Sequence, residues 1–352
     1  MTICFFGTYS PVYNRNVVLL KGLRKNGVKV IECRTDKTGI GRYVDLFKKH
    51  LKIRKDYDLM VVAFGGWYVL PLARILTRKK IIFDAFFSIY DSKVFDKQTV
   101  QKGRLKAGFY YLVDWLDCRL ADIILLDTNQ HLNFYIKTFN VNKNKLLKVL
   151  VGADEDVFYP AENKDNRKFE VVFYGTLIPL QGVEYIVEAA KLLENEEDIN
   201  IKLIGYKDRP YANNIKKRIE DLKLSNLKLL GRLSENDLAK EIRNADLCLG
   251  IFGDNEKANR VIPNKIYHSI ASKVPVVSGK TEAIRELFTD NKNILLCNRA
   301  DSEDLTEKIK YLKNNKDIGK EVANNAYDLY MEKCRPENIV KKMLNEINEN
   351  FK

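Results

Sequence analysis

The segment from Val261 to Lys265, with the sequence VIPNK, has residue types suited to binding an anion. It follows the apolar run DLCLGIFG and its loop, and it opens the helical pattern NKIYHSIAS. Proline suits the first turn of a helix because its missing N–H is not needed there, Asn264 can cap the helix, and Lys265 adds a positive charge. Free N–H groups and the dipole at a helix start favour phosphate. The backbone of residues 262–264 and Lys265 are therefore predicted to bind phosphate, although an ordinary capped helix with a surface lysine would have the same pattern.

The elements that would position this helix alternate between strand and helix patterns along the chain. Apolar runs such as TICFFG, IILLDT and IKLIG are separated by helical patterns, which indicates parallel sheets buried on both faces. Right-handed crossovers then give a doubly wound fold. The alternation breaks in the polar stretch GADEDVFYPAENKDNRK and restarts after it.

The predicted fold class is α/β, with two doubly wound, Rossmann-like parallel-sheet domains facing across a cleft. The predicted parts are an N-terminal domain at 1–155, a linker at 156–166, a C-terminal domain at 167–328, and C-terminal helices at 329–352 that pack back on the N-terminal domain. Ligands of open α/β sheets bind outside the carboxyl ends of the strands. The loops after glycine-ended strands are therefore candidate binding loops, among them those after Gly7, Gly175, Gly205 and Gly231.

The composition is that of a soluble globular protein. With 352 residues, 45% apolar and 30% charged, the chain exceeds what one core usually supports, which agrees with two domains. No apolar run approaches the roughly 20 residues of a membrane span, and the start MTICFFGTYS lacks the basic region of a signal peptide. The six cysteines form no C-x-x-C pair, so we expect buried reduced thiols rather than a zinc or redox site.

The net charge of +13 belongs to the N-terminal part of the chain. Residues 1–150 contain 27 Lys and Arg against 12 Asp and Glu, whereas residues 151–352 contain 33 against 35. This asymmetry predicts an anionic partner on one side, for which a membrane surface, a lipid-linked phosphate and a nucleic acid are candidates. The pattern RYVDLFKKHLKIRK, with Tyr43, Phe47 and Leu51 on one face, predicts a basic amphipathic helix that can lie on an anionic membrane. The expected location is cytoplasmic, with peripheral contact at the inner face of the membrane; packing of that helix face in the core is the alternative.

The order and spacing of several motifs resemble those of the GT-B glycosyltransferases, in particular the retaining family-4 branch. The stretch GTLIPLQGVEYIVEA resembles the family's G-x-L-x-x-x-K-G-x-x-x-L-I-x-A, and PNKIYHSIASKVPVV resembles a helix followed by A-x-G-x-P-V-V. VLVGADEDVFYP resembles the G-V-D-x-x-x-F-x-P segment that joins the two domains. The opening FGTYSPVYNRNVVLLKGLRKNGVKV resembles the family's first strand, glycine loop and helix, so the resemblance covers essentially the whole chain.

The resemblance implies a nucleotide-diphosphate sugar held mainly by the C-terminal domain, a glycan or lipid-linked acceptor held mainly by the N-terminal domain, and neither metal nor cofactor. It implies that Lys265 and the backbone of residues 262–264 stabilise the leaving diphosphate electrostatically. Gly175 and Thr176 would let the backbone approach the phosphates, Leu233 would lie at the base, and Arg15 would reach the phosphates from the other domain. The predicted catalytic residues are Lys265, Arg260 and Asp84, and the predicted binding residues are Gly7, Arg15, Gly175, Thr176, Gln181, Gly205, Arg232, Leu233, Ile262, Pro263, Asn264, His268 and Glu286.

The chain departs from the family pattern at four places. The family commonly has a lysine at the position of Gln181 and often an arginine at that of Thr176. It often carries two glutamates where this chain has Arg260 and His268. Its first sheet often contributes a histidine near the sugar, where this chain offers Asp84 and Asp91 in the loop FDAFFSIYDS. Either the charges have moved to other positions or catalysis is weaker.

Three other readings remain. A sugar-nucleotide epimerase would need acidic groups around the sugar, and a nucleotide-sugar-binding homologue would have lost turnover. Nucleic-acid binding ranks last because no RNP, zinc or helix-turn-helix signature is present. The acidic triplets at 56–58 and 154–156 are interpreted as structural rather than metal-binding, because neither follows a strand.

Overall fold

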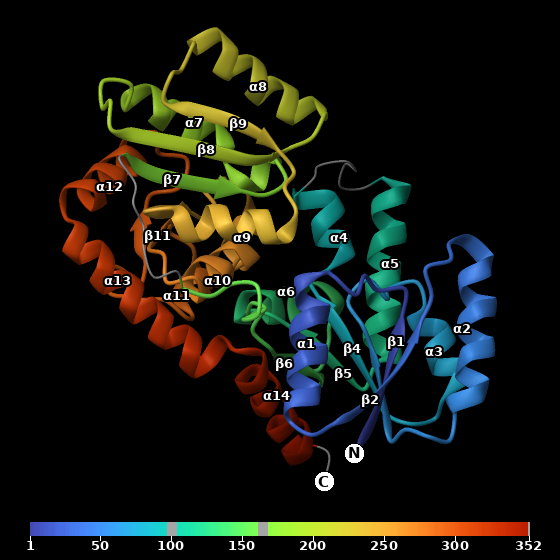
Figure 1. The fold of residues 1–352 in the computed structure, drawn as a ribbon. Helices are drawn as coiled ribbons and strands as arrows, with labels where there is room; N and C mark the ends of the chain where they lie inside the picture. Colours follow the sequence, from blue (N-terminus) through green and yellow to red (C-terminus); the bar gives the residue numbers. More distant parts are fainter. Residues whose placement is uncertain (97–103, 161–167, 351–352) are drawn as a thin grey trace. The chain divides into compact units, whose positions relative to one another are not determined.

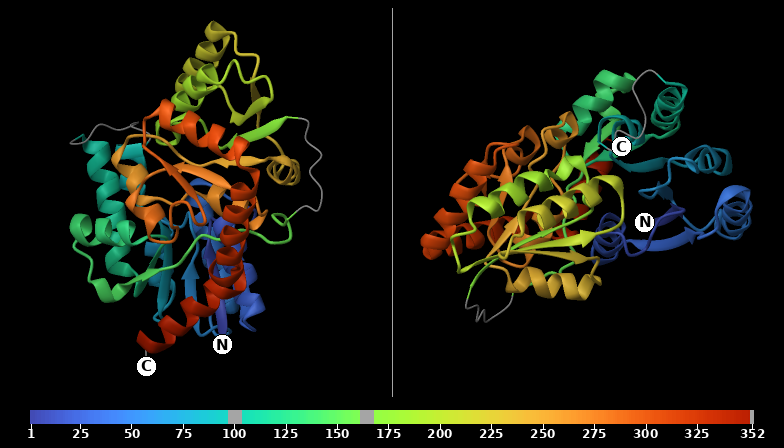
Figure 2. Two further views of the ribbon diagram at one scale, coloured as in Figure 1. Left: turned by 90° about the vertical axis from the view of Figure 1, so that its left-hand side faces the viewer. Right: turned by 90° about the horizontal axis from the view of Figure 1, so that it is seen from above.

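The computed structural model describes residues 1–96, 104–160 and 168–350 and divides into two compact units, each built on a parallel sheet (Figures 1 and 2). Unit 1 comprises Met1–Gly152 and Cys334–Lys352, and unit 2 comprises Ala153–Lys333. Each sheet has six strands within the described ranges, so the predicted class of two doubly wound domains is confirmed. Residues 161–166 of the predicted linker lie outside the described residues.

The sheet of unit 1 has the order β2-β1-β3-β4-β5-β6, with every neighbouring pair parallel. The chain starts with β1, next to one edge of the sheet, forms the edge strand β2 and returns on the other side of β1, so the order reverses between β1 and β3. The strands are β1 (Thr2–Gly7), β2 (Lys29–Arg34), β3 (Leu59–Val62), β4 (Ile81–Phe86), β5 (Ile123–Leu126) and β6 (Leu146–Lys148).

Both faces of this sheet are covered, as the continuous apolar strands predicted. Along β1, Cys4 and Phe6 point into one core cluster while Ile3 and Phe5 point into the other, since successive side chains of a strand alternate. The first cluster is covered by α2 (Gly39–Ile53), α3 (Leu70–Leu76), α5 (Leu105–Leu120) and α6 (Asn129–Phe139), and the second by α1 (Asn14–Lys25) and α14 (Pro336–Asn350).

Helix α14 belongs to unit 1 although it comes from the end of the chain, and it packs along α1 (Figure 1). The close approach depends on Gly22, because a Cβ at this position would lie 2.2 Å from the carbonyl oxygen of Pro336 and 2.4 Å from Val340. A second link comes from Asn26, whose side-chain amide donates to the carbonyl of Glu337 at 2.9 Å.

The sheet of unit 2 has the order β12-β11-β10-β7-β8-β9, again all parallel. Its strands are β7 (Phe169–Tyr174), β8 (Ile199–Tyr206), β9 (Leu227–Gly231), β10 (Leu247–Leu249), β11 (Val276–Gly279) and β12 (Leu295–Cys297). Its helices are α7 (Val183–Leu192), α8 (Pro210–Leu222), α9 (Glu235–Asn244), α10 (Asn264–Ala271), α11 (Glu282–Arg285), α12 (Ser302–Asn314) and α13 (Lys316–Leu329).

The six cysteines are all buried and form no disulfide. Within residues 1–96, 104–160 and 168–350, none of the helices combines the length and apolar composition required to cross a bilayer.

Two glycine-to-alanine substitutions should separate packing from helix propensity. Gly22→Ala is expected to destabilise unit 1 by about 1–3 kcal/mol, because its methyl group overlaps the α14 backbone. Gly108→Ala, in α5, meets no atom within 4 Å and should stabilise the same unit by up to about 1 kcal/mol. Urea unfolding of the two variants would measure both effects, and a neutral Gly22→Ala would contradict the close packing of α1 and α14.

Candidate functional site

The carboxyl ends of the unit 2 strands meet at one edge of the sheet, and the strand order reverses there between β7 and β10. From β7 the chain moves outward through β8 and β9 and then returns to β10 on the other side of β7. Such a reversal is where open α/β sheets bind ligands. The helix predicted to bind phosphate starts at this position, since α10 begins at Asn264, after β10.

Lys265, in the first turn of α10, is buried at the reversal point. Its Nζ donates to Oε1 of Gln181 at 2.6 Å and to the carbonyl oxygen of Gly250, after β10, at 3.3 Å. The amine also lies 3.5 Å from the ring centroid of Phe173 in β7, which is a cation–π contact. Only 4% of the residue is exposed. The sequence predicted a surface or ligand-facing lysine, and the structure adds that its neighbours come from both central strands.

The neighbours of the Lys265 amine are neutral. Among the described residues Lys265 forms no ion pair, and its hydrogen-bond acceptors are an amide and a carbonyl. Burial lowers the pKa of the amine well below its ordinary value because the charged form loses its hydration. A buried cation without a carboxylate raises the free energy of the folded chain, so an anion bound beside it would be held strongly.

The start of α10 offers backbone amides to the same region. The N-cap is Pro263, and no side chain accepts a hydrogen bond from this helix end. The prediction that Asn264 caps the helix is wrong, because Asn264 is itself the first helical residue. The first amides of a helix have no full-turn acceptor. That of Ile266 donates to the carbonyl of Pro263 at 3.0 Å, which leaves the amides of Asn264 and Lys265 for another acceptor.

Glycines bring the strand ends close together around Lys265. A Cβ at Gly175 would lie 3.3 Å from Nζ of Lys265, and one at Gly205 would lie 2.3 Å from the carbonyl oxygen of Gly175. Both glycines have positive φ angles, of 146° and 117°, which side chains rarely adopt. The loop that carries Gln181 packs against Phe252, whose amide donates to the Gln181 carbonyl at 3.0 Å.

The other residues of unit 2 that were predicted to bind the nucleotide sugar lie around this edge of the sheet and differ in how far they are buried. Thr176, Arg232 and Leu233 are exposed on the loops after β7 and β9, and Leu233 is 38% exposed. Arg260 is half-buried at the end of the 3-10 turn Glu256–Arg260 that precedes α10, and Glu286 is the C-cap of α11. Ile262 is buried, and Pro263 and Asn264 are half-buried.

His268 lies inside α10 rather than on its surface. Its ring stacks on Phe158 with centroids 3.9 Å apart, and its Nδ1 lies 2.7 Å from the hydroxyl of Tyr174. Burial raises the pKa of Tyr174, so the hydroxyl stays protonated and donates to Nδ1. Burial lowers the pKa of His268 to about 3. The ring is therefore neutral, and no partner of its Nε2 is found among the described residues.

In unit 1 the predicted residues Arg15 and Asp84 form a buried ion pair. Nε and Nη2 of Arg15 donate to the Asp84 carboxylate at 2.9–3.1 Å, and Nη1 donates to the carbonyls of Val149 and Leu150 at 2.8 Å. Both side chains are fully buried. Burial raises the pKa of the Asp84 carboxyl, and the guanidinium opposes that rise.

This setting differs from both predicted roles. Arg15 was expected to reach phosphates and Asp84 to lie near the sugar, but the pair instead ties α1 to β4 and to the end of β6 within unit 1. Gly7, the remaining predicted residue of this unit, ends β1 with a φ of 140°.

Comparison with known proteins agrees with the fold and identifies the family. A family model described as glycosyl transferases group 1 matches residues 154–329, half of the chain. The chain belongs to the group 1 glycosyltransferases. The two sheets accordingly have the GT-B fold.

The curated and solved proteins that are similar to this chain are distant from it in sequence. An uncharacterized glycosyltransferase of Methanocaldococcus jannaschii, MJ1178, is 27% identical over 184 residues, which cover 52% of this chain and 48% of that protein. The chain thus matches about half the length of this curated relative. Anabaena Alr3699/HepE, solved in complex with UDP-glucose, has a TM-score of 0.75 at 13% identity over 99% of both chains. The sucrose-phosphate synthase of Thermosynechococcus elongatus has a TM-score of 0.75 at 13% identity, over 99% of this chain and 98% of that one.

Sequence reasoning missed several residues of the candidate site. Phe173 and Phe158 are apolar residues of a strand and a linker, and nothing in their local pattern shows that they contact Lys265 and His268. Arg299 braces the loop after β10 by donating from Nη1 to the carbonyls of Gly253 and Asn255 at 3.2 and 3.3 Å. Its position after β12, at the same sheet edge, was the available signal.

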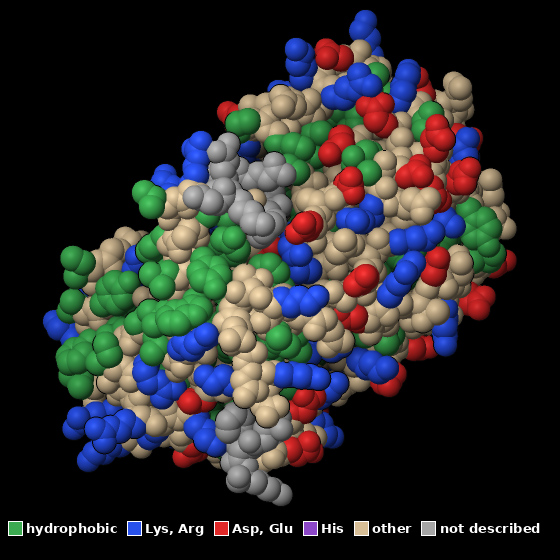
Figure 3. Space-filling model, turned by 180° about the vertical axis from the view of Figure 1, so that it is seen from behind, with side chains coloured by type: hydrophobic (Ala, Val, Ile, Leu, Met, Phe, Trp, Pro, Cys, Tyr) green, Lys and Arg blue, Asp and Glu red, His purple; other side chains and the backbone are tan. Residues whose placement is uncertain are grey.

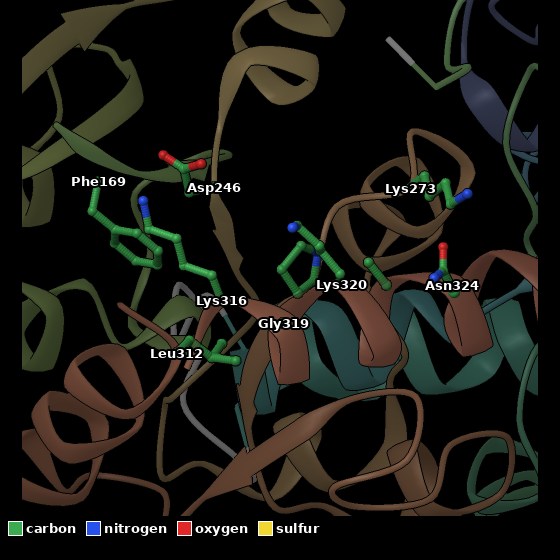
Figure 4. Close-up of a pocket in the computed structure, with 10 residues that line it drawn as sticks. Phe169, Asp246, Lys273, Leu312, Lys316, Gly319, Lys320 and Asn324 are labelled. Carbon is green, nitrogen blue, oxygen red and sulfur yellow. The ribbon is translucent and has the colours of Figure 1, made fainter. Parts of the chain in front are cut away.

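A cavity of about 370 Å³ lies elsewhere in unit 2 (Figure 4). It is lined by Phe169 and Asp246 near the amino ends of β7 and β10, and by Lys316 and Lys320 of α13. The predicted site residues of unit 2 lie at the carboxyl ends of the strands, so this cavity is separate from the candidate site. Within the described residues no group of three or more His, Cys, Asp or Glu is placed to hold a metal ion.

Replacing His268 with glutamine is expected to reduce the amount by which the free energy of unfolding falls when the pH is lowered. The folded-state pKa of about 3 lies below the value near 6.5 of a solvated histidine. The unfolded chain therefore binds more protons between these values, and His268 lowers stability as the pH falls from about 6.5 towards 3. Between pH 6.5 and pH 5 the variant should lose about 2 kcal/mol less than the parent protein, measured by urea unfolding. Parallel pH profiles would contradict a buried neutral ring.

Asp84→Asn should show that the Arg15–Asp84 pair is structural. Removing one charge leaves the guanidinium buried and poorly paired, which is expected to cost about 3–5 kcal/mol in thermal or urea unfolding. Arg24→Gln breaks the exposed pair with Glu32 in the same unit and should cost less than about 1 kcal/mol. An Asp84→Asn variant as stable as the parent protein would contradict this account.

Proposed function

We propose that this protein transfers a sugar from a nucleoside-diphosphate sugar to a glycan or lipid-linked acceptor, with retention at the sugar and without a metal ion, in the synthesis of a cell-surface glycan. The observation that carries the proposal is the buried Lys265 amine at the strand-order reversal, where neutral groups are its neighbours. Family membership and the Anabaena relative solved with UDP-glucose support a nucleotide sugar as donor.

In this proposal Lys265 and the α10 amides neutralise the departing diphosphate. Negative charge develops on the leaving oxygen as the bond to the sugar breaks, and groups already held in place stabilise that charge without reorganising. Binding of the diphosphate would return the Lys265 amine to its charged form, because an adjacent anion raises a lysine pKa. A metal ion is not needed for this step when a lysine supplies the positive charge. Arg260 is proposed as a second cation for the diphosphate.

The glycines would set the distance between the phosphates and the protein backbone. Gly175 faces Nζ of Lys265 directly, so a side chain there would occupy the space next to the amine. Thr176 and Leu233 are exposed at the same sheet edge, and the proposal assigns them to the phosphates and the base. Retention and the glycan pathway rest on the motif resemblance to the family-4 branch.

The acceptor is assigned to unit 1. The proposed location is the cytoplasm, at the inner face of the membrane, where lipid-linked acceptors are found. The support is the positive charge of this part of the chain, since residues 1–150 carry the whole net excess of Lys and Arg.

Lys265→Met tests the donor site because it keeps the side-chain length and removes the charge. With UDP, GDP, ADP and dTDP at about 100 times Kd, the best nucleotide should stabilise the parent protein by about 2.7 kcal/mol and the variant by none. Without nucleotide, the variant should melt at or above the parent temperature, because the cost of burying an ionisable amine without a carboxylate is removed. Lys216→Met, at an exposed lysine of unit 2, is the control and should bind like the parent. Unchanged nucleotide stabilisation of Lys265→Met would remove the proposed site.

Hydrolysis and transfer assays with the matching sugar nucleotide distinguish the alternatives. Release of free sugar that is lost in Lys265→Met supports a transferase, and the anomeric configuration of the product, read by NMR, tests retention. Binding without any turnover would favour a nucleotide-sugar-binding homologue, for which Arg260 and His268 in place of two glutamates are the argument. Conversion of the donor sugar to its epimer would favour an epimerase.

A further inference from the structure

Helix α2 has two apolar stripes, of which only one is used by the core. Leu46 and His50 are buried, with Tyr43 and Ile53 packed beside them. The other stripe consists of Ile40, Val44, Phe47 and Leu51, at the spacing i, i+4, i+7 and i+11, and these side chains are 45–80% exposed. The sequence placed Tyr43 on one face with Phe47 and Leu51, but the structure turns Tyr43 toward the core and the other two outward.

Helix α5 repeats this arrangement. Leu105, Phe109, Leu112 and Leu116 have the same i, i+4, i+7, i+11 spacing and are 37–95% exposed. The inward positions of the helix are occupied by buried residues such as Ala107 and Cys118. A helix whose outer surface needs only to meet water would present polar residues at these positions.

The two stripes lie on one side of unit 1. Helix α3 packs against both α2 and α5 and adds the exposed Ile75. The Tyr43 hydroxyl donates to the carbonyl of Tyr68 at 3.1 Å, and the Tyr68 ring stacks on Phe109 with centroids 6.5 Å apart. In Figure 3 hydrophobic side chains gather over the side of the molecule that carries α2, α3 and α5 in Figure 1, with Lys and Arg side chains along their margin. We call this surface the apolar face; it consists of Ile40, Val44, Phe47, Leu51, Ile75, Leu105, Phe109, Leu112 and Leu116.

The charges around the apolar face are almost all positive. Residues 39–55 contain six Lys and Arg and one acid, Asp45, which pairs with Lys37 and Lys49. Residues 70–80 contain four Lys and Arg and no acid. Residues 104–120 contain three, and the two acids there, Asp114 and Asp117, are buried. The exposed side chains around the apolar face therefore attract anions.

We propose that the apolar face is a membrane-binding surface, which inserts its side chains among the lipid headgroups and acyl chains of an anionic bilayer while the surrounding Lys and Arg bind the headgroups. The apolar stripes of α2 and α5, on helices that both pack against α3 and with basic residues around them, match the side chains by which interfacial helices bind lipid. A second copy of this chain fits less well, because joining two such faces would bring like charges together. This inference rests on the proposed function, in which the acceptor is linked to a lipid. It adds that the lipid that carries the acceptor lies next to unit 1.

The test is co-sedimentation of the full chain with vesicles, without any sugar nucleotide. Binding to vesicles of equal parts phosphatidylcholine and phosphatidylglycerol is expected to be at least tenfold tighter than to phosphatidylcholine alone. The double variant Phe47→Gln/Leu112→Gln should bind the anionic vesicles at least tenfold more weakly. A matched control, Leu192→Gln/Tyr311→Gln, changes two exposed apolar residues of unit 2 and should bind like the parent. Melting temperatures of both double variants should equal that of the parent, since the changed side chains are exposed.

Two further sets of measurements test separately how deeply the apolar face enters the bilayer and how far the basic residues contribute to binding. Phe109→Trp should shift its emission to the blue and be quenched by lipids carrying a doxyl group on the acyl chain. Lys48→Glu/Lys52→Glu should lower binding to the anionic vesicles to that of the neutral ones. Equal binding to both kinds of vesicle, or undiminished binding of Phe47→Gln/Leu112→Gln, would overturn the proposal, as would a dimer in analytical ultracentrifugation that this double variant dissociates. Lys265→Met should bind vesicles like the parent protein, so failure at the membrane and failure at the donor site can be told apart.

Discussion

The amine of Lys265 connects the strand order of unit 2 to its chemistry. In a doubly wound sheet the crossovers on the two sides of the reversal point leave in opposite directions, so the strand ends there are not covered by a shared helix. Lys265 lies between those ends, with a carbonyl after β10 and an aromatic ring of β7 as neighbours. Because burial disfavours the charged form of this amine, the folded chain carries a cost that an anion can offset. The glycines of this edge are explained by the same requirement, since they let the backbones meet around one side chain.

Much of the fold could be predicted because its evidence is local. Each strand is a short apolar run, several end in glycine, and the break near residue 154 is polar, so the patterns themselves indicate two sheets. The roles of single residues depend on partners far along the chain. Arg15 follows a glycine loop whether it faces a ligand or an interior carboxylate 69 positions away, and only the folded structure distinguishes these cases. Similarly, the proline before α10 suggested a capped helix, but the position of the first helical residue decides whether Asn264 caps.

Amphipathic periodicity has a related limit, which α2 illustrates. A helix with one apolar stripe and a helix with two adjacent stripes have similar sequence patterns. Aromatic and aliphatic residues at neighbouring angles around the helix then look like a single broad apolar face. Tyr43 and Phe47 are one turn apart in sequence, yet the first packs with the core and the second is exposed. His268 shows the same limit in another form. Its position within α10 left a ribose-binding role and a packed or surface position open, and stacking on Phe158, a residue of the segment before β7, encloses it.

The return of α14 to unit 1 makes unit 2 a continuous insertion, since Ala153–Lys333 enters and leaves a body made from both chain ends. A fragment that stops at Gly152 would expose the groove at Gly22 and the apolar side of α1, which α14 covers in the whole protein. The second body, by contrast, can be excised by two cuts without dividing its own sheet. The same arrangement means that Ala153–Lys333, with Lys265 and the start of α10, could be exchanged as one cassette, while the sheet of unit 1 stayed together with α1 and α14.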